Sequence, residues 1–96
     1  MAASNFYYYN INFKKKGTGK WVFAQGEISN ESGKDYNTAL FRLSIYDKSA
    51  LMWTGNIKVM GFRKRQTRTF ELLLEGLNYR SMSAISRYEI YFESGY

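Results

Sequence analysis

The sequence Phe41-Arg42-Leu43-Ser44-Ile45-Tyr46-Asp47 alternates between apolar and polar residues and ends on an aspartate. Successive side chains of a β-strand point to opposite faces of its sheet, so residues 41, 43 and 45 would share one buried face. Tyr46 would then lie on the opposite face, and Asp47 would begin a turn by accepting a hydrogen bond from a following amide. The stretch therefore predicts a half-buried strand that runs into a loop.

Five further segments carry strand-like patterns, with turn residues between them. The predicted strands span residues 6–13, 21–29, 36–46, 51–60, 67–74 and 87–93. Apart from the short stretch 70–77, apolar residues do not recur at helical spacing, and residues 77–86 are compatible with one short helical turn or with a long crossover. Six strands at this spacing predict an all-β fold, an antiparallel two-sheet immunoglobulin-like sandwich of six to seven strands.

The same alternation assigns the faces of each strand. The apolar faces of the five later strands consist of Val22, Ala24, Gly26, Ile28, Ala39, Phe41, Leu43, Ile45, Leu51, Trp53, Gly55, Ile57, Val59, Phe70, Leu72, Leu74, Tyr88, Ile90 and Phe92. In the first strand, strict alternation separates Tyr7, Tyr9, Ile11 and Phe13 from Phe6, Tyr8, Asn10 and Asn12. A glycine inside a strand, such as Gly26, usually marks a bulge or the close approach of another backbone.

Length and composition point to one globular domain over residues 1–96, with an ordered core of about 5–94. The chain is 45% hydrophobic and 19% aromatic, which a packed core requires and a disordered chain lacks. Cysteine and histidine are both absent. Disulfides, thiolate metal sites and cysteine nucleophiles are therefore excluded, and so are zinc hydrolases and serine–histidine triads within this chain. We expect neither an enzyme nor a bound cofactor or metal.

The net charge of +6 suits nucleic acid, an anionic surface or an acidic protein as a partner, and it also suits simple solubility. No apolar stretch approaches the ~20 residues that cross a bilayer, so no transmembrane segment is expected. The first residues lack the basic and apolar regions of a signal peptide. The compartment therefore stays open.

Three stretches resemble the FxLYD domain family. The first is Phe41-Arg42-Leu43-Ser44-Ile45-Tyr46-Asp47, which resembles the name-giving pattern. The second is Gly26-Glu27-Ile28-Ser29-Asn30-Glu31-Ser32-Gly33-Lys34-Asp35-Tyr36, which is similar to the strand and turn that precede that pattern. The third is Gln66-Thr67-Arg68-Thr69-Phe70, similar to the family's threonine-led aromatic strand. Together they cover about residues 20–93.

The resemblance implies an immunoglobulin- or fibronectin-III-like sandwich, often an accessory module of prokaryotic envelope or surface proteins, and it implies no catalytic residues. The chain departs from the family at the connection 61–65, which is strongly basic where members usually carry Pro-Gly-Glu. Its aromatic first strand also has no counterpart in the pattern.

Two groups of residues are candidates for partner contacts. A predicted aromatic contact face, on the outward side of the first strands, consists of Phe6, Tyr8, Trp21 and Phe23. A predicted polyanion contact consists of Lys14, Lys15, Lys16, Phe62, Arg63, Lys64, Arg65 and Arg68. The aromatic residues could instead be buried or pack between copies of the chain. The basic residues could instead form solvated turns, or protect an edge strand from aggregation, and they make one surface only if both loops lie at the same end.

Other polar residues favour structural roles. Glu71, Glu75, Glu89 and Glu93 should see water, where cross-strand ion pairs explain them better than a glycosidase pair does. Asn30 can cap the turn after the second strand, and it is also an accessible acceptor if its Asn-Glu-Ser tripeptide meets a glycosylating enzyme.

These observations predict a non-catalytic interaction or spacer module that meets a protein or a neighbouring domain through an aromatic face or an open strand edge. The alternative is a basic β-domain that binds nucleic acid or another polyanion. The oligomeric state, and whether the 96 residues are one module of a longer protein, stay open.

Overall fold

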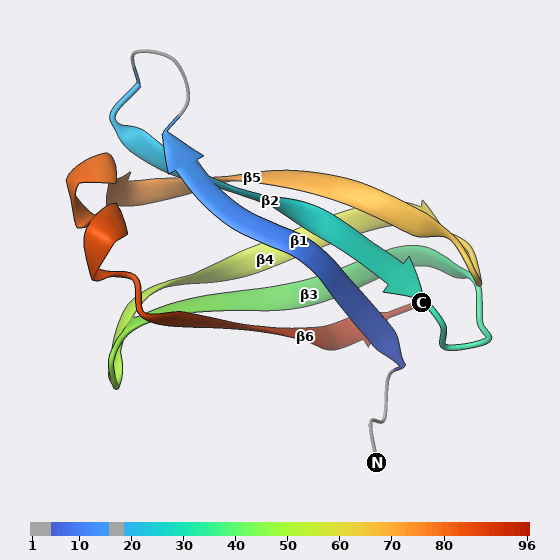
Figure 1. The fold of residues 1–96 in the computed structure, drawn as a ribbon. Helices are drawn as coiled ribbons and strands as arrows, with labels where there is room; N and C mark the ends of the chain where they lie inside the picture. The colour runs from blue at the N-terminus through green and yellow to red at the C-terminus, as the bar shows by residue number, and fades with distance from the viewer. Residues whose placement is uncertain (1–4, 16–18) are drawn as a thin grey trace.

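The computed structural model describes residues 5–15 and 19–96, and within them six strands form two antiparallel sheets (Figure 1). Sheet A has the order β1 (Phe6–Lys15), β2 (Trp21–Asn30), β5 (Thr67–Asn78), and sheet B has the order β4 (Ala50–Phe62), β3 (Tyr36–Asp47), β6 (Arg87–Gly95). Strands A-B-E and C′-C-F of an immunoglobulin-like sandwich take this order. The predicted all-β two-sheet sandwich is confirmed.

Residues 77–86, for which the sequence allowed a short helical turn or a long crossover, contain a 3₁₀ helix, η1 (Tyr79–Ala84). This helix connects sheet A to sheet B. Asn78 caps its first turn, because Oδ1 accepts a hydrogen bond of 3.0 Å from the Arg80 amide. The Tyr79 amide donates to the Lys20 carbonyl at 2.8 Å. The start of η1 is therefore fastened to the start of β2.

The core lies between the two sheets, and the alternation correctly predicts the buried residues of the middle strands. Ala39, Phe41, Leu43 and Ile45 of β3 are fully buried, and so are Val22, Ala24 and Ile28 of β2. Phe41 is the centre of an aromatic cluster, with the Phe6 ring 5.0 Å away at 83° and the Phe92 ring 5.7 Å away at 68°. Edge-to-face contacts of this kind add to the free energy of burying the rings.

A β-bulge in β1 overturns the predicted faces of that strand. The pairing with β2 shifts between Tyr9 and Asn12, and Asn10 takes a left-handed backbone with φ 53°. An extra residue reverses the alternation beyond it, so Tyr8 points inward before the bulge and Phe13 points inward after it. Both pack against the core. Strict alternation, which put these two residues on opposite faces, is therefore wrong for β1.

Gly26 lies under this bulge and confirms the expected close approach. A Cβ atom there would overlap Cδ1 of Ile11, and it would lie 3.0 Å from Cε2 of Phe70 and 3.2 Å from the Tyr9 carbonyl oxygen. The bulge of β1 thus rests on β2 where the side chain is missing.

Two side chains fasten the edge strands β4 and β5 together. Trp53 donates from Nε1 to the Glu75 carbonyl at 3.1 Å. Arg68 donates from Nη1 to the carbonyls of Met60 (3.1 Å) and Gly61 (3.2 Å). Leu51, which alternation assigns to the apolar face of β4, is 55% exposed, because the pairing with β3 shifts between Leu51 and Trp53 and sets Leu51 opposite Tyr46.

Candidate functional site

The two basic segments lie at opposite ends of the sandwich. Lys14 and Lys15 pair with the start of β2, whereas the connection between β4 and β5 meets its end, where the Arg65 amide donates to the Asn30 carbonyl at 2.7 Å. Ten residues of β2 separate the ends, a span of about 30 Å. Lys16 is outside the described residues. The described lysines and arginines of the two segments therefore do not form one shared basic surface, which would need both segments at the same end.

At the far end, Phe62 is wrongly predicted as an exposed aromatic. It is fully buried, and its ring lies 5.9 Å from that of Phe6. Strict alternation from the buried Ile57 and Val59 would turn Phe62 outward, but Gly61 takes a left-handed backbone with φ 62° and breaks the alternation just before it. Arg68 is likewise a poor contact for a polyanion, because its Nη1 is committed to the two carbonyls of β4 described above.

The three cations between them, Arg63, Lys64 and Arg65, are exposed. The Arg63 amide donates to Oε1 of Gln66 at 3.0 Å, and the Lys64 amide donates to Oδ1 of Asp35 at 2.8 Å. These contacts order the backbone of the loop and leave the charged side chains in water. They fit the alternative of a solvated turn.

The predicted aromatic face also divides. Phe6 is 7% exposed and stacks on Phe92 at 4.8 Å, and Tyr8 meets the edge of Phe41 at 6.2 Å. Burial raises the pKa of Tyr8 to about 12. Both residues face the core, so their assignment to an outward face is wrong. The reason is that the even-numbered residues of β1 before its bulge point inward.

Trp21 and Phe23 do lie on the outer face of sheet A, half-buried and two residues apart on β2. The strand pairing sets Phe23 between Lys14 of β1 and Leu73 of β5, and Leu73 is 40% exposed. The Lys20 ammonium lies 4.9 Å from the centroid of the Trp21 ring. Aromatic rings and cations are thus neighbours at this end.

At the same end, but on the core-facing side of β1, where Lys15 pairs with the buried Val22, the Lys15 ammonium lies 4.2 Å from the centroid of Tyr79. We call the whole group the hairpin-end patch: Lys14, Lys15, Lys20, Trp21, Phe23, Leu73 and Tyr79. Its members come from β1, the residue before β2, β2, β5 and η1, and these elements meet at the left of Figure 1. The patch brings the surviving parts of both predicted contact sites together.

Sequence reasoning missed three of these residues. Lys20 could have been found, because it precedes Trp21 directly. Leu73 and Tyr79 could not, because their place depends on the register of β5 against β2 and on the course of η1.

A shallow groove follows along the same face of sheet A. It has a volume of about 490 Å³ and is lined by Asn10, Asn12, Gln25, Gly26, Glu27, Thr69, Phe70 and Glu71. Asn10 donates to Glu27 at 3.1 Å, and Gln25 donates to Glu71 at 2.6 Å. The two carboxylates repel an anion, so they limit the anion-binding part of the face to the hairpin end.

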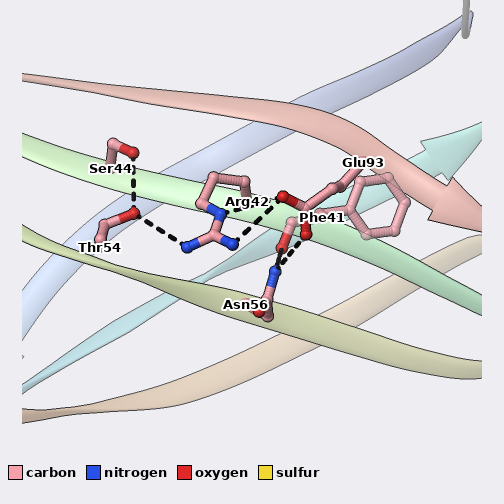
Figure 2. A network of polar contacts seen from close by, with 6 residues as sticks. All are labelled: Phe41, Arg42, Ser44, Thr54, Asn56 and Glu93. Carbon is pink, nitrogen blue, oxygen red and sulfur yellow. Dashed lines mark hydrogen bonds and ion pairs between the residues drawn. The ribbon is translucent and has the colours of Figure 1, made fainter.

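The outer face of sheet B carries a polar network that spans three strands (Figure 2). Arg42 donates from Nε and Nη2 to one oxygen of Glu93, at 3.2 Å each, and Asn56 donates to the other oxygen at 2.8 Å. Nη1 of Arg42 reaches Thr54 at 3.4 Å, and Thr54 lies 3.1 Å from Oγ of Ser44. Because these groups satisfy one another, the network stabilises β4, β3 and β6 as a sheet.

The last residues of the opening motif also take structural roles. Tyr46 lies on the face opposite the core, as predicted, and its hydroxyl donates to Glu89 at 3.4 Å. The Arg87 guanidinium lies 3.9 Å from the Tyr46 ring centroid and pairs with Glu89 at 2.7 Å. The Arg42–Glu93 ion pair joins β3 to β6, whereas the Arg87–Glu89 ion pair lies within β6. The predicted cross-strand ion pairs are therefore confirmed in part.

Asn30 is fully buried, and its amide group joins three segments. Nδ2 donates to the carbonyls of Lys34 (2.8 Å) and Phe62 (3.4 Å), and Oδ1 accepts from the Ser32 amide at 3.0 Å. The predicted turn cap is confirmed. The prediction that this residue is an accessible glycosylation acceptor is wrong, because the Nδ2 atom that a glycan would need lies inside the fold.

Among residues 5–15 and 19–96, no three acidic side chains gather in a way that could hold a metal ion, and no helix has the length and apolarity to span a membrane. A scan against protein-family models finds no match, and searches among curated proteins and among solved structures find no similar protein. The hairpin-end patch is therefore judged on its own chemistry.

Proposed function

We propose that this domain is a non-catalytic binding module and that it engages an anionic partner through the hairpin-end patch. The observation that supports the proposal is that two lysines flank two half-buried rings of β2: the Lys20 ammonium lies 4.9 Å from the centroid of the Trp21 ring, and strand pairing sets Lys14 beside Phe23. Binding sites are enriched in aromatic side chains, which offer a large rigid contact at a small cost in conformational entropy. The lysines supply attraction to negative charge at long range.

Charge reversal tests the proposal, with heparin as a generic polyanion. Lys14→Glu with Lys20→Glu reverses the patch, and Arg63→Glu with Arg65→Glu is the matched control with the same change in net charge. We expect the patch variant to lose at least tenfold in affinity and the control to lose less than threefold, because exposed charges about 30 Å away are screened at physiological salt. Equal losses in both variants would show that net charge alone attracts heparin, and the proposal would fail.

A second candidate function is docking of a protein or a neighbouring domain. Tyr7 and Tyr9 favour it, because they are 52% and 47% exposed on the outer face of β1. Such binding should survive high salt, and Tyr7→Ser with Tyr9→Ser should abolish it while heparin binding stays. Membership of the FxLYD family, and the envelope location that it implies, stay predictions.

A further inference from the structure

We infer that the anionic partner is a single-stranded nucleic acid whose bases stack on Trp21 and Phe23 while Lys14 and Lys20 meet its phosphates. The inference rests on the proposed function and names the ligand class of the same patch. Proteins bind single strands by this combination of a cationic surface and aromatic rings, whatever the base sequence.

The spacing of the rings fits successive bases. Trp21 and Phe23 are two residues apart on one face of β2, a separation of about 6.7 Å at the rise of a strand. An extended single strand places neighbouring unstacked bases on platforms of this kind, as aromatic side chains of sheet surfaces do in RNA-binding domains. A duplex keeps its bases stacked inside and cannot use the rings in this way.

The cations lie where the backbone of such a strand would run. Lys14 flanks Phe23 across the β1–β2 pairing, and Lys20 lies over Trp21 at 4.9 Å. An exposed cation–π contact is weaker than the stacking of a base on an aromatic ring, so a base can displace the Lys20 ammonium. The displaced ammonium then lies beside the ring, within reach of the phosphate of the same nucleotide.

Acidic residues on the outer face of sheet A limit how far the site extends. Gln25 and Glu27 follow Phe23 on the outward side of β2, and Glu71 pairs with Gln25 from β5. A phosphate that moved along β2 past Phe23 would meet these carboxylates. The footprint therefore stays at the hairpin end and includes Lys14 and Lys20, the two patch lysines on the side of the rings. Two phosphate contacts on a single strand predict a slope of about −1.4 for the logarithm of affinity against that of salt. Affinity should fall about 7-fold between about 50 and about 200 mM salt.

The experiment follows the fluorescence of Trp21 in the Trp53→Phe variant, which leaves one tryptophan in the chain. The probes are a short oligothymidylate, an abasic oligomer of equal length, a duplex of equal length, and heparin. We expect the oligothymidylate to quench Trp21 and to bind at least fivefold more tightly than the abasic oligomer. Phe23→Leu keeps an apolar side chain and removes the ring, and it should weaken oligothymidylate binding at least fivefold. Tyr91→Leu, at a 50% exposed ring on sheet B, should change it less than twofold.

Any other outcome contradicts either the inference of a single-stranded nucleic acid or the proposed function as well. If heparin and the abasic oligomer bind as tightly as oligothymidylate and Trp21 is not quenched, the patch binds charge alone: the inference fails and the proposed function stands. If the duplex binds more tightly than the oligothymidylate, the inference likewise fails and the proposed function stands. If no probe binds at about 50 mM salt, both fail. Amide spectra of each variant confirm that a loss does not come from unfolding.

Discussion

Replacement of Asn30 by alanine should be among the costliest single changes at a polar residue of this domain. The side chain is fully buried and is bonded at three backbone groups, the Lys34 and Phe62 carbonyls and the Ser32 amide. Alanine keeps the backbone bonds of the site and removes these three side-chain bonds, together with the bond of 2.6 Å that Oδ1 accepts from the Ser32 hydroxyl. The variant therefore measures how much one amide group contributes where the turn after β2, the end of β4 and the following loop meet.

The magnitude follows from the groups that lose a partner. The Lys34 carbonyl and the Ser32 amide make good bonds, at 2.8 and 3.0 Å, and each costs about 1–3 kcal/mol if it is left without a partner in the interior. Water can reach the turn from its exposed side, which favours the lower part of the range. We expect a loss of about 2–4 kcal/mol, out of about 5–14 kcal/mol for a domain of this size. The Tm should fall by about 10–30 °C.

Urea unfolding followed by tryptophan fluorescence measures the loss, and Asn12→Ala is the control. Asn12 is exposed and donates to the Asn10 carbonyl at 3.0 Å, so its replacement should cost less than about 1 kcal/mol. If Asn30→Ala costs no more than this control, the argument from buried bonds is refuted. Asn30→Asp places an acceptor against both carbonyls and should be at least as unstable at neutral pH. It should recover stability towards pH 4, because a protonated carboxyl can donate.

Three further predictions concern separate parts of the fold. Burial raises the pKa of Tyr8 to about 12, above about 10 in the unfolded chain, so stability should fall as the pH rises from about 10 to about 12, and Tyr8→Phe should remove this part of the fall in urea titrations. Glu93→Gln should cost about 1 kcal/mol in the same assay because Glu93 accepts from side chains of both β3 and β4, whereas Glu89→Gln, at a more exposed pair, should cost less than about 0.5 kcal/mol. Gly26→Ala should cost about 1–3 kcal/mol through the overlap with Ile11, and additivity with Ile11→Ala in a double-mutant cycle would contradict that cause.

If the hairpin-end patch binds as proposed, the fold explains how a small sandwich can do so without a cavity. Sheet pairing sets Lys14, Phe23 and Leu73 in one row across three strands. On the opposite face of the same strand, Val22 and Ala24 are fully buried in the core. The contact side chains thus stand on a rigid element, which lowers the entropy lost on binding.

The strands themselves could be read from the chain, because alternation is a local property. Phe41, Leu43 and Ile45 are each apolar at a spacing that only one face of a strand can satisfy, and all three are fully buried. The turn cap at Asn30 was predictable for the same reason, since an asparagine accepts from an amide two residues away whatever lies around it.

The contact surface depended on contacts between distant residues. A bulge in β1 separates the inward-pointing Tyr8 from the inward-pointing Phe13. Asparagine tolerates the left-handed backbone that Asn10 takes there, but one asparagine within a strand does not by itself predict a bulge. Phe62 and Arg68 could be assigned only when β4 and β5 met at the edges of two sheets. The local period of a strand shows that it has two faces. Packing against segments far away in the chain decides which face is buried, and it also decides which residues each charged side chain contacts.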